Sequence, residues 1–227
     1  MRAGSFGRPS LLLSAVFLFS LAADAADRVR IVNEGGIRDA WMLAPGTSLP
    51  VPAYPAAHAA NQAEACVGIG YLLNADGTTS DFALLKSWSA AEPNRDREAY
   101  WASFAQDASN ALAHWKFAPR PEVASPRPVY TVATFLFGSR NAAELRKRCA
   151  IPNLALRLVE LRHDRKASRK MAGNDLFERL DIDPALEDRY RDQQRQRDEA
   201  LRRERSEPPP TPNPNPNPNP NPPSGGG

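Results

Sequence analysis

The sequence predicts an α+β fold in which a small antiparallel three-stranded sheet packs against one main helix. Two runs that alternate apolar and polar residues flank a tight-turn signal, which is typical of a β-hairpin. An amphipathic stripe with helical spacing follows, and a run of β-branched and aromatic residues ends the region. All three signals lie within residues 54–138, which we therefore predict to be the folded domain.

The first 25 residues have the pattern of a cleavable signal peptide. Arg2 and Arg8 precede an apolar run from Leu11 to Ala23, which is shorter than the ~20 residues that a membrane-spanning helix needs. Small residues at positions 23 and 25 suit signal peptidase, so we expect cleavage after Ala25 and export of the mature chain. An uncleaved N-terminal anchor is the alternative.

Export changes how the two cysteines are interpreted. Cys66 and Cys149 would lie in an oxidising compartment and are even in number, so we expect a disulfide between them. It would close a loop of more than eighty residues, which a chain-entropy argument values at about 4 kcal/mol. Two thiols too far apart to meet are the alternative. Between the signal and the domain, residues 26–53 are predicted to be a short linker, with a strand at 28–33 as an option.

The domain begins with a predicted short helix at residues 55–63, which Pro55 can open because its missing N–H costs nothing in a first turn. The first strand follows over residues 66–73, and its alternation places Val67, Ile69, Tyr71 and Leu73 on one face. Asp76 and Gly77 supply the turn chemistry, and the second strand runs over residues 80–86.

The main helix and the last strand complete the predicted core. Apolar residues recur at intervals of three and four along the helix, namely Tyr100, Phe104, Ala108, Ala111, Leu112 and Trp115. Pro119 ends that helical pattern, because the residue before a proline is pushed out of the helical region. The run from Val129 to Phe137 is the strongest strand signal in the chain.

The remaining chain has a different composition. Residues 139–206 are rich in both charge signs and are predicted to be a charged helical extension, with a largely solvated helix from Pro184 to Arg205. Residues 207–227 repeat Asn-Pro and cannot pack a core, so we expect a disordered tail.

Catalytic chemistry is not indicated. His58, His114 and His163 lack metal-ligand spacing, and neither a nucleophile motif nor a phosphate-binding loop is present in the sequence. We therefore expect no enzyme activity, no cofactor, no metal and no catalytic residue. A formal net charge of +3 over 227 residues is too small to indicate nucleic-acid binding.

The order of motifs between Tyr54 and Phe137 resembles the C-terminal domain of TonB energy-transducing proteins. The residues that carry this resemblance, in chain order, are Tyr54, Pro55, Val67, Asp76, Gly77, Phe104, Trp115, Phe117 and Pro119. The resemblance implies a TonB C-terminal-like fold and a periplasmic module that binds an extended segment of an outer-membrane receptor by strand addition. It also implies a partner-binding edge formed by Val129, Tyr130, Thr131, Val132, Ala133, Thr134 and Phe135.

Two function classes are therefore open. The first is a periplasmic TonB-like protein-binding module in receptor-linked transport. The second is a structural or envelope-interaction protein that reuses the fold without transducing energy, because the Pro-rich segment follows the domain instead of preceding it. Membrane contact is expected only if the N-terminal segment is uncleaved, which would leave an inner-membrane anchor facing the periplasm.

Overall fold

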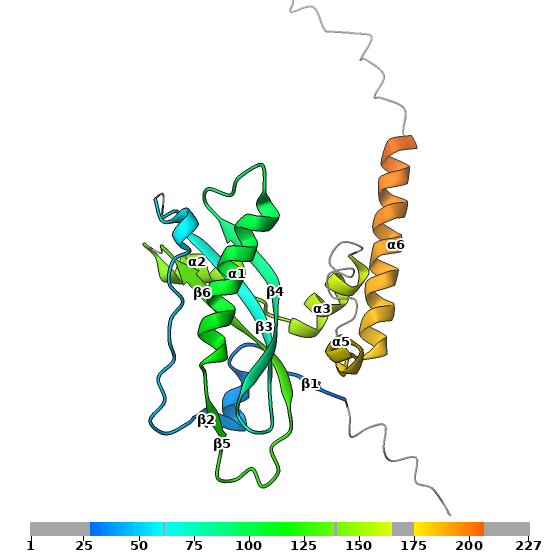
Figure 1. Cartoon of the computed structure of the whole chain (residues 1–227). Helices are drawn as coiled ribbons and strands as arrows, with labels where there is room; N and C mark the ends of the chain where they lie inside the picture. Colours follow the sequence, from blue (N-terminus) through cyan, green and yellow to red (C-terminus); the bar gives the residue numbers. More distant parts are fainter. Residues whose placement is uncertain (1–27, 61, 139, 165–174, 207–227) are drawn as a thin grey trace, which may run out of the picture.

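A computed structural model of the chain describes residues 28–60, 62–138, 140–164 and 175–206. The predicted signal peptide (1–25) and the predicted tail (207–227) lie outside the described residues. Among those that are described, a central sheet carries α1 on one face and further helices on the other (Figure 1). The fold is α+β, as the periodicities predict.

The main sheet has four strands in the order β1-β6-β3-β4. Its members are β1 (Arg30–Ile31), β3 (Ala65–Leu73), β4 (Thr79–Ser89) and β6 (Val129–Phe137). Three strands are antiparallel neighbours, whereas β1 pairs in parallel with β6. The predicted three-stranded antiparallel sheet is therefore wrong in strand number and in sense. A two-residue strand is too short to show a period of two.

The hairpin between β3 and β4 has the predicted turn. The Gly77 amide donates to the Asn74 carbonyl oxygen at 2.9 Å, and Gly77 has a φ of 80°. Asp76 accepts hydrogen bonds from both the backbone N–H and the hydroxyl of Thr78, and these bonds lower the pKa of its carboxyl. Any side chain at position 77 would collide with the Phe117 carbonyl, so the turn requires glycine here.

One face of the sheet packs against α1 (Arg97–Ala113). Odd-numbered residues of β3 point toward this helix, and the fully buried Phe104 lies 4.9 Å from Phe137, centroid to centroid, in an edge-on contact. A second small sheet, β2 (Trp41–Leu43) with β5 (Phe117–Pro119), closes the lower end of this core. Within the predicted helix 55–63, the described residues (all except residue 61) form only a single 3-10 turn, η3 (Ala56–His58).

The other face is buried as well. It is covered by α2 (Ala142–Cys149), α3 (Leu154–His163) and α5 (Asp175–Arg179). Asn141 and Asn153 cap the first two helices through their side-chain oxygens. The buried side chains that form this second core include Tyr130, Val132, Leu154, Leu158, Phe177 and Leu180. The region predicted as a charged extension thus supplies half of the sheet's cover.

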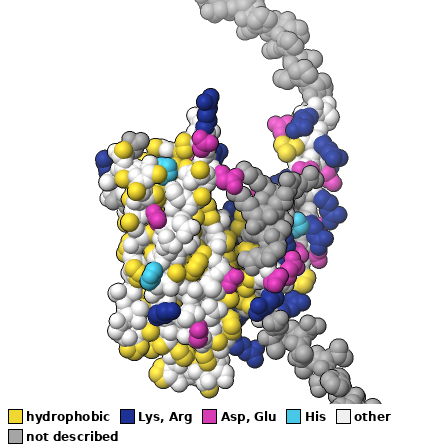
Figure 2. Space-filling view, in the orientation of Figure 1, with side chains coloured by type: hydrophobic (Ala, Val, Ile, Leu, Met, Phe, Trp, Pro, Cys, Tyr) yellow, Lys and Arg dark blue, Asp and Glu magenta, His cyan; other side chains and the backbone are white. Residues whose placement is uncertain are grey.

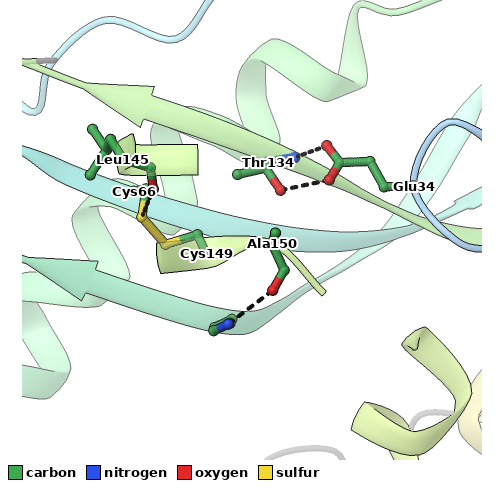
Figure 3. Close-up of a disulfide and its surroundings, with 7 residues drawn as sticks. Glu34, Cys66, Thr134, Leu145, Cys149 and Ala150 are labelled. Carbon is green, nitrogen blue, oxygen red and sulfur yellow. Dashed lines mark hydrogen bonds between the residues drawn. A yellow bond between two sulfur atoms is a disulfide. The ribbon is translucent and has the colours of Figure 1, made fainter. Parts of the chain in front are cut away.

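A disulfide joins these layers. Cys66 on β3 is bonded to Cys149 at the end of α2, and both are fully buried (Figure 3). The expected pairing is the one that the structure contains. The bond holds α2 against β3 over a sequence separation of 83 residues.

The final helix, α6 (Pro184–Ser206), has no buried residue. Its first turns contact the second core through Leu186 and Tyr190, and Glu187 pairs with Arg162. Figure 2 shows side chains of both charge signs spread over this helix. Its solvated character agrees with the alternating charges in its sequence.

Residues 28–53 differ from a plain linker. Besides β1 and β2 they contain the turn η2 (Gly36–Asp39), and they bury Val29 and Trp41 to 2% and 3% exposure. The backbone of Val29 bonds to residues 179 and 181, so this segment is held between β6 and the chain after α5. Its contacts are with residues far away in the chain, so no local sequence pattern predicts them.

Candidate peptide-binding edge of the sheet

The outer side of β6 is the edge at which the resemblance places partner binding. Backbone groups of a strand point alternately to its two neighbours. Val32 donates its N–H to the Tyr130 carbonyl oxygen at 2.9 Å. The backbone N–H and C=O groups of the even-numbered residues of β6 therefore point away from β3. The outer side therefore presents the amides and carbonyls of Tyr130, Val132, Thr134 and Leu136.

A strand covers only the beginning of this edge. Arg30 and Ile31 of β1 are opposite Val129 and Tyr130, and the chain then leaves β6 at Gly35, whose φ is 81°. Of the seven predicted edge residues, the first two are thus in the interior of the sheet. Beyond Tyr130, no described strand lies along the outer side of β6.

Glu34 occupies the place of a strand at the middle of β6. Its Oε1 accepts a hydrogen bond from the Thr134 amide and its Oε2 accepts one from the Thr134 hydroxyl, both at 2.9 Å (Figure 3). An Arg146 nitrogen on α2 lies 3.4 Å from the same Oε1. A carboxylate thus satisfies a backbone donor that the adjacent strand of a wider sheet would otherwise satisfy.

The neighbouring residue ties this contact to the second core. The Asn33 side-chain oxygen accepts a hydrogen bond from the Leu154 amide at 2.9 Å, at the start of α3. The Tyr71 phenol also lies near Glu34. Burial is the main cause that raises the pKa of this phenol, and the negative charge of the Glu34 carboxylate raises it further. Tyr71 therefore stays neutral beneath the edge.

The opposite edge of the sheet, β4, is irregular. Its register against β3 shifts twice, and Asp81 within it has a φ of 53°. Arg157 of α3 donates its Nε–H to the Leu85 carbonyl oxygen at 2.8 Å. Bulges that twist an edge disfavour pairing with a further strand. Of the two long edges, β6 beyond Tyr130 is therefore the regular one, since its register against β3 has no shift.

The family-motif residues lie away from this edge, and most of the apolar ones belong to the α1 core, whereas Asp76 and Pro119 are exposed. Tyr54 contacts Phe104 edge-on at 5.4 Å and donates its hydroxyl to the Ala63 carbonyl oxygen. Trp115 donates its indole N–H to the Pro50 carbonyl oxygen. The other members are Pro55 before η3, the buried Val67, Asp76 and Gly77 in the hairpin turn, and Phe117 and Pro119 in β5.

Two of the residues at the edge had no signal in the sequence. Glu34 lies in a segment without periodicity, and Arg146 is one of many charged residues on the extension. Their partner Thr134 is 100 residues from Glu34 in the chain. The pairing of β1 with β6 places Glu34 beside Thr134, and the packing of α2 on the sheet adds Arg146.

The described residues contain no group of three or more histidine, cysteine, aspartate or glutamate side chains arranged to hold a metal. His58 packs against the rings of Tyr100 and Phe104, and His163 against that of Tyr190. No helix in the described part of the chain has the length and apolar character needed to span a membrane.

Comparisons with known proteins give little identity. No family model matches the chain, and no curated protein matches it. Among solved structures, the solution NMR structure of the Pseudomonas aeruginosa TonB C-terminal domain matches with 22% identity and a TM-score of 0.33. That match covers 44% of this chain and 88% of the other. A similarity at this level defines neither family nor function.

Proposed function

We propose that the domain of residues 54–138 is a periplasmic protein-binding module that takes up an extended segment of an outer-membrane receptor along β6. The proposal is supported by the order of motifs in the sequence and by the N-terminal export pattern. Strand addition requires an edge with unpaired N–H and C=O groups, and that requirement selects between the two edges of the sheet.

One observation carries the proposal. The Thr134 amide, in the middle of β6, is bonded to a side-chain carboxylate and not to a strand. The backbone N–H and C=O groups of Val132 and Leu136 point to the same outer side, because these residues lie two positions before and after Thr134 in the strand. An extended peptide would pair with this row and extend the sheet beyond Tyr130.

Glu34 must leave for such a peptide to bind along the full row. Its ion pair with Arg146 is partly exposed, with side-chain exposures of 54% for Arg146 and 30% for Glu34, so that pair stabilises the edge by ~1 kcal/mol or less. An incoming backbone carbonyl can accept the Thr134 N–H in place of the carboxylate. Glu34 would therefore weaken peptide binding without preventing it.

Isothermal titration of the full chain with synthetic peptides from the extended segments of outer-membrane receptors tests the proposal. We expect saturable binding, and at least about tenfold weaker binding for Val132→Pro, because proline removes an outward donor. Ser87→Pro is the matched control, since Ser87 lies on the outer side of β4 by the same alternation. Circular dichroism checks that both variants stay folded.

Glu34→Ala should tighten peptide binding, because it removes the competing carboxylate. This variant distinguishes the β6 edge from any other binding surface and does not depend on a proline substitution. Absence of heat for every peptide with both the parent chain and Glu34→Ala would refute the proposal. Equal loss for Val132→Pro and Ser87→Pro would refute the assignment to β6.

A structural role in the envelope, without energy transduction, is the second proposal. It is favoured by α6, a helix of 23 residues with no buried side chain. Removing residues 192–227 keeps the contacts of Leu186 and Tyr190. The second proposal expects this truncation to lose retention in envelope fractions, whereas the first expects peptide binding to be unchanged.

A further inference from the structure

Three arginines line one cavity between β1 and the loop after β5. Figure 1 shows where β1 and this loop lie in the fold. The cavity has a volume of about 890 Å³. Arg28 and Arg30 line it from the β1 side and Arg127 lines it from the loop, together with Trp41 and Asp181. Neither the motif resemblance nor the β6 edge accounts for this cluster.

The alternation of the N-terminal segment sets the direction of two of these arginines. Val29 is buried in the second core and Ile31 packs against it, so Arg28 and Arg30 project from the other side of the chain. The Val29 N–H donates to residue 179 at 2.8 Å, and the Val29 carbonyl accepts from Asp181 at 2.9 Å. The arginines therefore extend from a backbone that is held on both sides.

The third arginine comes from a constrained loop. Arg127 lies between Pro126 and Pro128, whose rings fix their φ angles. Trp41 and Val129, which are both only 3% exposed, form an apolar wall of the cavity. The backbone positions from which the three arginines extend are thus held by strand pairing and by the two prolines.

The charges around the cavity are not balanced. Asp181 lies 3.9 Å from Arg28, and both side chains are more than half exposed. Across the described parts of the chain, no ion pair includes Arg30 or Arg127. The charged residues that line the cavity are therefore three arginines and one carboxylate. Like charges gathered in a cleft raise the local concentration of counter-ions.

We propose that this cavity is an anion-binding site for a ligand with phosphoryl or carboxylate groups that carry at least two negative charges. Guanidinium groups bind such oxyanions through paired N–H donors. The volume lies within the range of about 300–1,000 Å³ that is usual for small-molecule sites. The site is separate from the outer side of β6 beyond Tyr130 and does not rest on peptide binding.

Isothermal titration of the full chain at low ionic strength tests this site with two probes, pyrophosphate and citrate. We expect binding of at least one probe, weakened about tenfold or more by Arg30→Gln combined with Arg127→Gln. Asp181→Asn should tighten binding, because it removes the competing carboxylate. Arg189→Gln combined with Arg197→Gln is the charge-matched control, since both arginines are exposed on α6 and do not line the cavity.

Each outcome is decisive. Binding of pyrophosphate alone identifies a phosphoryl site, and binding of citrate alone identifies a carboxylate site. No binding of either probe, or equal weakening by Arg189→Gln combined with Arg197→Gln, would overturn the proposal, the latter by showing a non-specific charge effect. Glu34→Ala should leave anion binding unchanged, so failure here is distinguishable from failure of the peptide-binding proposal.

Discussion

The two faces of the central sheet are both buried, but they are covered in different ways. The first face lies under α1, one helix of 17 residues with a continuous apolar stripe. The second lies under three helices of 8, 10 and 5 residues together with Val29 and Ile31 from the N-terminal segment. Periodicity identifies a face that one long element covers, and it misses a face assembled from short pieces.

The largest expected effect is on the first face. Phe104→Ala should lower the free energy of unfolding by about 3–5 kcal/mol, because removing this fully buried ring leaves a cavity among its four aromatic neighbours. Urea denaturation followed by circular dichroism measures it. Ala102→Gly on the exposed side of α1 is a control for helix propensity alone, with a cost of about 1 kcal/mol. Equal costs would contradict this account of the α1 core.

Removing the disulfide tests the second face. Cys66→Ala with Cys149→Ala should lower the free energy of unfolding by about 2–4 kcal/mol, since the unfolded chain loses a long closed loop. Thermal unfolding of the parent chain with and without reductant, compared with the double variant, measures the effect. A double variant as stable as the oxidised parent would show that α2 needs no covalent tie to the sheet.

Gly70→Ala probes how closely the second face is packed. A methyl group at this position would overlap the Tyr130 hydroxyl and lie 2.7 Å from Leu85 Cδ1, so we expect a loss of about 1–3 kcal/mol in urea denaturation. Gly68→Ala is the matched control, because its nearest contact is Ile151 Cδ1 at 3.2 Å. Combining Gly70→Ala with Tyr130→Phe should recover part of the loss, and no recovery would contradict the assigned overlap.

Tyr130→Phe is the smallest change and has the opposite sign. The Tyr130 hydroxyl is buried and has no hydrogen-bond partner among the described residues, so its removal should stabilise the fold by up to about 1 kcal/mol. Burial raises the pKa of this phenol in the folded state. As pH rises above about 10, the phenol ionises in the unfolded chain but not in the folded one, so the parent protein loses stability. Melting curves at neutral and alkaline pH should therefore show the variant gaining more at the higher pH.

Local patterns were enough to predict the elements of the first face. The hairpin turn at Asp76 and Gly77, the stripe on α1 and the run that forms β6 each express their structure within a few residues. The pairing of Cys66 with Cys149 was also accessible, since two cysteines in an exported chain have few alternatives. None of these inferences needs a contact between distant segments, apart from the disulfide itself.

The second face and the candidate site could not be predicted in that way. Gly68 and Gly70 look like weak points of a strand until Ile151 packs on the first and Tyr130 and Leu85 pack on the second. Glu34 is an ordinary acidic residue until β1 places it beside Thr134. Arg28, Arg30 and Arg127 are likewise three scattered charges until β1 and a proline-bounded loop bring them to one cavity.

The sequence by itself therefore determined the class of fold, the hairpin, the main helix and the cysteine pairing, because these depend on short-range periodicity and on composition. Only the tertiary structure decided that the sheet has a fourth, parallel strand, that its second face has a core, and that a carboxylate occupies the outer side of β6. The contacts behind these features join residues far apart in the chain, 100 positions for Glu34 and Thr134 and 121 for Asn33 and Leu154. No local pattern encodes such contacts, since they form only when separate elements pack together.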